Sequence, residues 1–192
     1  MMGYARLAAF SNCFTVNTTS TPPSAAAMLL AAGRGERMRP LTDTCPKPLL
    51  QVQGKPLMQW PMEALVRGGF DQVVINTAWL GEQIEQQFGS IFGLQPPSNM
   101  RNQLSNQEQF TASLHIQYSH EGRDFGGALE TAGGIARALP QLGEVFWVLA
   151  GDVYAPDFVF AQDAVTRFVH SGMLAHLWLV PNPEHNPAGD FG

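Results

Sequence analysis

The chain has 192 residues, of which 45% are hydrophobic and only 14% are charged, which suits one folded domain of ordinary size. Eleven basic and sixteen acidic residues give a net charge of −5, which argues against a general nucleic-acid binder because such proteins need a basic surface. Two cysteines exclude a disulfide framework and a four-cysteine zinc site, and no apolar run is long enough for a transmembrane helix.

The first 26 residues differ in composition from the rest. They contain one charged residue, Arg6, and a stretch rich in Ser, Thr and Pro over residues 18–24. The apolar stretch over residues 7–10 is too short for a secretory signal peptide, and a single arginine makes a poor transit peptide. We therefore predict a flexible leader over residues 1–26, followed by one folded domain over residues 27–192.

From residue 27 onward, short apolar runs alternate with segments of helical periodicity. The predicted elements are, in chain order, a strand over 27–31, a short apolar segment over 48–52, a helix over 58–67, a strand over 72–76, a helix over 81–88, a strand over 113–118, a helix over 130–139, a strand over 146–150, a helix over 157–170 and a strand over 175–180. Residues 93–111 are rich in Pro, Asn and Gln without periodicity, which indicates a loop insertion. Strands separated by helices predict an α/β, Rossmann-like, three-layer fold with a mostly parallel sheet and helices on both faces.

The turn after the first predicted strand carries the pattern Gly33-Arg34-Gly35. A strand followed by Gly-x-Gly lets backbone N–H groups approach phosphate oxygens closely. The turn lacks the third glycine of a dinucleotide-binding fingerprint and the Gly-Lys-Ser/Thr of a P-loop, which disfavours a dehydrogenase and a P-loop NTPase. Five of the eleven basic residues lie between positions 34 and 55; they are Arg34, Arg37, Arg39, Lys47 and Lys55. In an acidic protein this concentration indicates a local anion site, and the alternative is a solvated turn with incidental charge.

The segment from Leu30 to Met38, together with Pro46-Lys47-Pro48-Leu49, resembles the sugar-1-phosphate nucleotidyltransferase family. Further matching segments are residues 75–81, 121–122, 129–134, 151–153, 182–183 and 189–191. The resemblance covers residues 27–192 apart from the 93–111 loop. It implies a cytoplasmic enzyme that transfers UMP from UTP to a sugar 1-phosphate and releases pyrophosphate. The sequence most resembles the members of this family that use N-acetylmuramate α-1-phosphate in peptidoglycan recycling.

The same resemblance implies roles for individual residues. The implied nucleotide-binding positions are Ala32, Gly33, Gly35, Glu36, Arg37, Lys47 and Gly122. Among the catalytic positions, Arg37 would pair with the leaving pyrophosphate, and Lys47 would lie against the α-phosphate or the sugar phosphate as a point charge. Asp152, the third, would hold Mg²⁺, since it follows a buried strand at the end where ligands bind in α/β sheets. The positions that match sugar contacts are Glu130, Ala150 and Asp190.

Each of these carboxylates has a structural alternative. Asp152 could cap the next helix or stabilise the turn after Gly151. Glu130 could be a helix N-terminal charge that the helix dipole favours. Asp190 could be a surface turn residue.

The sequence departs from the family pattern in three ways, two of which leave the substrate open. Ala150 stands where this group of proteins favours Asn, and Ala132 replaces a Gly. A related guanylyl- or thymidylyltransferase acting on a hexose 1-phosphate is therefore an alternative. The chain also ends before several strands and helices that family members have, so we expect an incomplete domain, and a nucleotide-binding remnant without catalysis is a second alternative. Nothing in the sequence indicates an oligomeric state.

Overall fold

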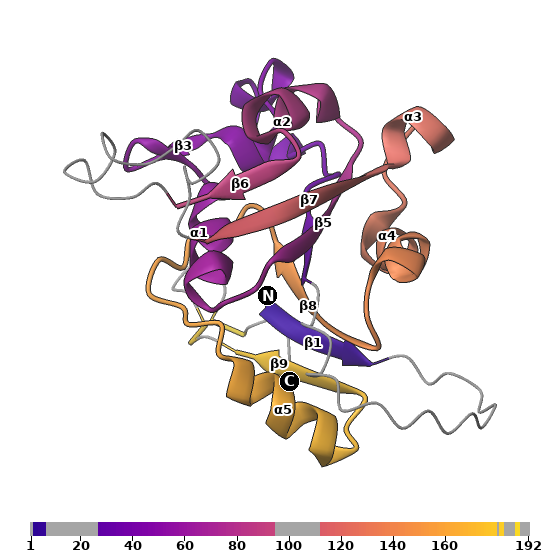
Figure 1. Ribbon diagram of the computed structural model, residues 1–192. Coiled ribbons are helices and arrows are strands. Elements are labelled where there is room, and N and C mark those ends of the chain that lie inside the picture. Colours follow the sequence, from indigo (N-terminus) through magenta and orange to yellow (C-terminus); the bar gives the residue numbers. More distant parts are fainter. Residues whose placement is uncertain (1, 7–26, 95–111, 180, 183–186, 189–192) are drawn as a thin grey trace, which may run out of the picture.

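A seven-stranded mixed sheet forms the centre of the molecule (Figure 1). The computed structural model describes residues 2–6, 27–94, 112–179, 181–182 and 187–188. From one edge to the other, the strands are β6 (Ile91–Gly93), β7 (Ser113–His120), β5 (Gln72–Thr77), β2 (Ala27–Leu30), β8 (Val145–Ala150), β1 (Met2–Arg6) and β9 (Ala175–Trp178). A small hairpin of β3 (Gln51–Val52) and β4 (Lys55–Pro56) lies outside this sheet.

Strand direction and register bring three strand ends to the same level. Strands β7, β5, β2 and β8 run parallel to one another, whereas β6 pairs antiparallel with β7 and β1 pairs antiparallel with both β8 and β9. Leu30, the last residue of β2, lies opposite Asn76 of β5 and Ala150 of β8. The carboxyl ends of these three strands therefore meet at one edge, where ligands bind in open α/β sheets.

Helices cover both faces of the sheet, as the alternation of side chains along the strands requires. The helices are α1 (Gln59–Arg67), α2 (Gly81–Phe88), α3 (Glu121–Phe125), α4 (Glu130–Ala138) and α5 (Gln162–Ser171). Leu29 and Ile75 belong to the larger core, which contains buried residues of α1, α2 and α5. Met28 and Val74, one residue earlier on the same strands, pack against α4 through Ala138. The predicted three-layer fold with a mostly parallel sheet is confirmed.

Packing of the aromatic core explains where the last predicted helix begins. The periodicity over residues 157–170 predicted a helix from residue 157, but α5 begins at Gln162. Phe160 is fully buried, with its ring centroid 4.8 Å from that of Trp147, and Phe158 lies 6.0 Å from the same ring. Packing of these two rings against Trp147 holds residues 157–161 out of the helix, and Ala161 has an extended backbone.

The start of the chain also differs from the expectation. Met2–Arg6 form strand β1 between β8 and β9, where a flexible leader over residues 1–26 was predicted. Composition predicted the leader, but strand pairing joins main-chain groups and does not require a particular side-chain pattern. Residues 7–26 and most of the predicted 93–111 insertion lie outside the described residues. The short elements β6 and α3 were not predicted.

Candidate active site

A cavity of about 600 Å³ lies at the carboxyl ends of β2, β5 and β8. Leu30, Asn76 and Ala150, which face one another across these strands, are all part of its wall. The structure brings most of the predicted site residues into this wall; they are Ala32, Gly33, Gly35, Glu36, Arg37, Lys47, Glu130, Ala150 and Asp152. Its size is that of a pocket for a small organic ligand.

Two glycines shape the turn after β2 in different ways. Gly35 has φ +69°, and a Cβ there would lie 3.0 Å from Cγ2 of Thr42 and 3.1 Å from Cβ of Lys47. The Thr42 hydroxyl donates a hydrogen bond to the Gly35 carbonyl oxygen at 3.0 Å. At Gly33 a Cβ would meet no atom of the described residues within 4 Å. Gly35 is therefore required by the turn itself, whereas Gly33 leaves open space at the cavity wall.

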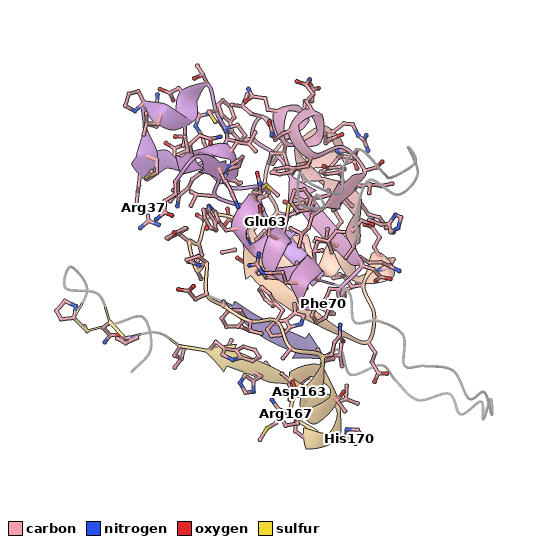
Figure 2. The ribbon with its side chains drawn as sticks, turned by 60° about the vertical axis from the view of Figure 1, so that its left-hand side comes forward. Arg37, Glu63, Phe70, Asp163, Arg167 and His170 are labelled. Carbon is pink, nitrogen blue, oxygen red and sulfur yellow. The ribbon has the colours of Figure 1, made fainter. Side chains whose placement is uncertain are left out.

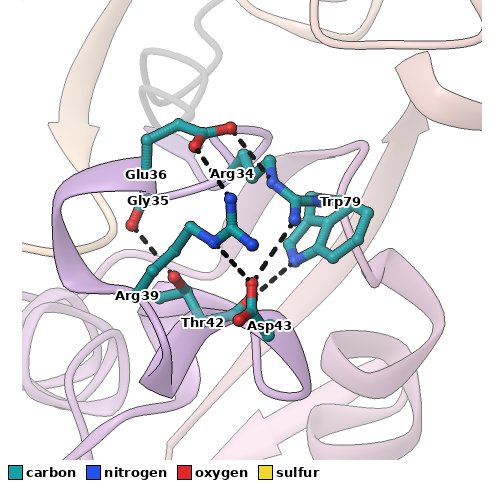
Figure 3. Close-up of polar contacts among 7 residues, drawn as sticks. All are labelled: Arg34, Gly35, Glu36, Arg39, Thr42, Asp43 and Trp79. Atoms are coloured by element: carbon teal, nitrogen blue, oxygen red, sulfur yellow. Dashed lines mark hydrogen bonds and ion pairs between the residues drawn. The ribbon is translucent and has the colours of Figure 1, made fainter.

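Two of the arginines in this turn are engaged within it (Figure 3). Arg34 stacks on Trp79, with Cζ 3.6 Å from the ring centroid, and its guanidinium pairs with Glu36 at 3.0 Å and with Asp43 at 3.5 Å. Arg39 donates to the same Asp43 carboxylate at 2.8 Å. These contacts hold the turn together and reduce the charge that Arg34 and Arg39 present to a ligand.

Arg37 differs from its two neighbours. Its exposed side chain lies on the cavity wall and projects from the turn (Figure 2). Within the described part of the chain, it makes no hydrogen bond or ion pair. Its guanidinium can therefore form a bidentate pair with an anion without breaking an existing contact.

Lys47 and Asp152 form an ion pair across the cavity wall, with Nζ 2.6 Å from Oδ2. Lys47 begins a 3-10 turn (Lys47–Leu49), and Asp152 follows β8 after Gly151. The Gly151 N–H donates to the Leu30 carbonyl oxygen at 2.9 Å, and a Cβ at Gly151 would lie 3.0 Å from that oxygen. Gly151 thus extends the β2–β8 pairing by one residue and places Asp152 at the cavity. Both side chains of the pair remain partly exposed.

The carboxylates of the cavity fit a metal ion that a bound phosphate group also coordinates. Asp152, Glu130 and Glu36 line the wall. Among the residues that the structure describes, no group of three or more His, Cys, Asp or Glu side chains could hold a metal ion. Mg²⁺ binds through one or two carboxylates together with phosphate oxygens, so Asp152 can hold it when a phosphate supplies the other ligands.

Comparison with known proteins identifies the family. The family model described as "Nucleotidyl transferase" matches residues 26–192. The chain belongs to the nucleotidyl transferase family. Solved structures of a UDP-glucose pyrophosphorylase, apo and with UDP-glucose, share the fold of this nucleotidyl transferase, with TM-scores of 0.52 and 0.50 at 20% and 21% identity. Both alignments cover 76% of this chain, and 54% and 53% of the respective solved chains.

Curated relatives of this nucleotidyl transferase are more similar in sequence. The N-acetylmuramate alpha-1-phosphate uridylyltransferase of Neisseria meningitidis serogroup B is 50% identical over 169 residues, which cover 86% of this chain and 63% of the relative. The UTP–glucose-1-phosphate uridylyltransferase of Synechocystis sp. is 38% identical over 136 residues, which cover 66% of this chain and 30% of the relative. The chain thus spans less than two thirds of each relative. Within the described residues, no helix of this nucleotidyl transferase has the length and apolar character needed to cross a membrane.

Three residues that the sequence analysis singled out are not placed on the cavity wall. Gly122 packs against the main chain after β5, where a Cβ would lie 2.7 Å from the Ala78 carbonyl oxygen. Ala132 is exposed on α4 and does not line the cavity, so its methyl group does not narrow it. Asp190 lies outside the described residues, and its assignment to the sugar stays a prediction.

Sequence reasoning missed two buried polar residues of this nucleotidyl transferase, one in the cavity wall and one hydrogen-bonded to it. Asn76 is 3% exposed and lines the cavity, and Glu121 is 0% exposed. Both fell in segments used for the resemblance, but neither was assigned a role. The signal for Asn76 was present, because an amide side chain near the carboxyl end of an apolar strand is unusual unless it has a partner.

Proposed function

We propose that this domain transfers UMP from UTP to a sugar 1-phosphate, giving a UDP-sugar and pyrophosphate. The observation that carries the proposal is the joint presence, in one cavity, of three features. These are a glycine turn with open space at Gly33, the exposed guanidinium of Arg37, and the Lys47–Asp152 ion pair. A solvated turn would not bring a lysine and a carboxylate 105 residues apart together at the end of the central strands.

The reaction needs charge stabilisation and positioning from the chain. An oxygen of the sugar phosphate attacks the α-phosphorus of UTP, the bond from that phosphorus to the bridging oxygen breaks, and pyrophosphate leaves. The attacking oxygen already carries negative charge, so no protein nucleophile is required. Burial raises the pKa of the Cys45 thiol, the one cysteine among the described residues, which keeps it a poor nucleophile.

Each charged residue has a place in this scheme. Arg37 binds the β- and γ-phosphates, which become the leaving pyrophosphate. Lys47 leaves Asp152 for the α-phosphate when the nucleotide enters. Asp152 would hold Mg²⁺, which would supply neutralisation of the phosphate charge.

The choice of UTP and of the sugar rests on the relatives. Both curated relatives described above are named as uridylyltransferases, and the one from Neisseria meningitidis is named for N-acetylmuramate α-1-phosphate. We therefore infer the same acceptor here, and with it a place in peptidoglycan recycling. With this role we also infer a cytoplasmic location.

The test is pyrophosphate release by the purified 192-residue chain in the presence of Mg²⁺. UTP is supplied with N-acetylmuramate 1-phosphate, N-acetylglucosamine 1-phosphate or glucose 1-phosphate in separate reactions, and GTP and dTTP replace UTP in parallel. The expected result is release with UTP and N-acetylmuramate 1-phosphate, and none from the Asp152→Asn variant. Release with another base or sugar overturns the substrate assignment, and no release from a folded sample overturns the activity of this chain.

A further inference from the structure

A buried amide in the cavity wall is hydrogen-bonded to a buried carboxylate. Asn76 of β5 donates from Nδ2 to Oε1 of Glu121 at 2.8 Å, and its Oδ1 accepts the Ala31 N–H at 2.8 Å. Oε2 of Glu121 accepts the Leu129 N–H at 2.7 Å. Glu121 itself does not line the cavity. A single hydrogen-bonded chain thus runs from Ala31, through Asn76 and Glu121, to Leu129.

The polarity of this chain is set at its two main-chain ends. A main-chain N–H can only donate a hydrogen bond, whereas an amide side chain has one donor end and one acceptor end. The Ala31 N–H therefore holds the Asn76 oxygen toward itself and directs the Asn76 NH₂ group to Glu121. Glu121 accepts at both of its oxygens, from Asn76 and from Leu129, so the network needs an acceptor at each of these two atoms.

The two ends of the chain lie in two different segments that contribute residues to the cavity. Ala31 begins the glycine turn that leads to Gly33 and Arg37. Leu129 precedes Glu130, a cavity residue whose backbone has φ +59°, a left-handed conformation that non-glycine residues adopt only under constraint. Glu121 thus holds the glycine turn and the strained start of α4 in fixed positions relative to each other.

Helix α4 can pack over this pair because the residue that faces it, Gly134, has no side chain. A Cβ at Gly134 would lie 2.6 Å from Oε1 of Glu121 and 2.8 Å from Nδ2 of Asn76. At Gly134 the helix therefore approaches the pair with main-chain atoms, and both side chains of the pair are shielded from water. A buried carboxylate is unfavourable unless its acceptors are satisfied, so its presence here needs a reason beyond core packing.

We propose that Glu121 and Asn76 are positioning residues for the nucleotide, and that their hydrogen-bond polarity holds the glycine turn and the start of α4 in the binding geometry. The inference rests on the proposed function for the identity of the nucleotide. The network itself stands on the contacts alone, and the two can be tested separately.

The experiment exchanges donor and acceptor within the pair. Glu121→Gln places an NH₂ group against one of the two donors, and Asn76→Asp places two carboxylates in contact. The double variant Glu121→Gln/Asn76→Asp restores every hydrogen bond. Its carboxylate at position 76 accepts from the amide NH₂ at position 121 and from the Ala31 N–H, and the amide oxygen at position 121 accepts from the Leu129 N–H. Glu82→Gln, at an exposed carboxylate on α2, is the control for the loss of one negative charge.

Binding of UTP with Mg²⁺ is measured by calorimetry, together with kcat and KM where turnover is present. We expect each single variant to weaken UTP binding by about 10- to 100-fold, because each leaves a buried polar group without a partner. The double variant should recover to within about 3-fold of wild type, as coupled residues do in a double-mutant cycle. A double variant that binds no better than the weaker single variant, or that does not fold, overturns the proposal.

Amide hydrogen exchange separates this proposal from the proposed function. We expect faster exchange at Ala31 and Leu129 in Glu121→Gln, unchanged exchange in the core strand β8, and restored protection in the double variant. If the wild-type chain binds no UTP, the nucleotide assignment fails while the exchange pattern still tests the pair. Unchanged exchange at Ala31 in Glu121→Gln overturns the positioning role whatever the ligand.

Discussion

Replacing Gly35 with alanine tests whether the turn after β2 is held in one geometry by its surroundings. The φ of +69° alone costs a non-glycine residue about 1–2 kcal/mol. The new Cβ would lie 3.0 Å from Thr42 Cγ2 and 3.1 Å from Lys47 Cβ, well inside ordinary carbon contact, and relieving this overlap costs about 1 kcal/mol more. The expected loss of about 2–3 kcal/mol corresponds to a fall in Tm of roughly 4–12 °C for a domain of this size.

Gly33→Ala is the matched control in the same turn. A Cβ there meets no atom of the described residues, and the backbone is not left-handed, so Tm should stay within about 1–2 °C of wild type. Because Gly33 lines the cavity, the same change should weaken UTP binding. Thermal unfolding by circular dichroism, with and without UTP and Mg²⁺, reports both quantities. A Gly35→Ala protein that unfolds at the wild-type temperature, or a Gly33→Ala protein that is destabilised yet binds UTP normally, would refute the assignment of the two glycines.

Three further predictions concern the charged residues of the cavity. Arg37→Ala should leave Tm unchanged and raise the KM for UTP. Arg39→Ala removes an ion pair outside the cavity and should leave this KM unchanged. Equal KM values for the two variants in steady-state assays would contradict this prediction. Asp152→Asn should abolish Mg²⁺-dependent turnover in a protein that unfolds like wild type, and retained turnover would remove Asp152 from the metal site. Lys47→Ala should lower kcat/KM by about 10²-fold through loss of one charge-stabilising group, and wild-type kinetics would place Lys47 outside the reaction.

Local pattern was sufficient for the four parallel strands β2, β5, β7 and β8, for most helices and for the glycine turn. The run over residues 27–31 and the glycines that follow are read from short-range spacing, since strand and turn preferences act over a few residues. Helices α1 and α2 agree with their predicted ranges to within one residue for the same reason. The resemblance then selected Arg37, Lys47 and Asp152, and the fold places all three on one cavity.

Long-range packing decided the rest. The sequence shows five basic residues near one turn, but only the fold turns Arg34 onto Trp79 and leaves Arg37 open to the cavity. Helical periodicity continues into residues 157–161, but burial of Phe160 beside Trp147 excludes them from α5.

The sequence by itself therefore determined the fold class, the glycine turn after β2 and the charges that surround it, because these depend on residue type and on neighbours within a few positions. Only the tertiary structure showed that β1 lies between β8 and β9, and that Asn76 meets Glu121 across 45 residues. The physical reason is the same in both cases. Strand pairing and buried hydrogen bonds join groups that are distant in the chain, and their partners are selected by which groups the packed core brings within bonding distance.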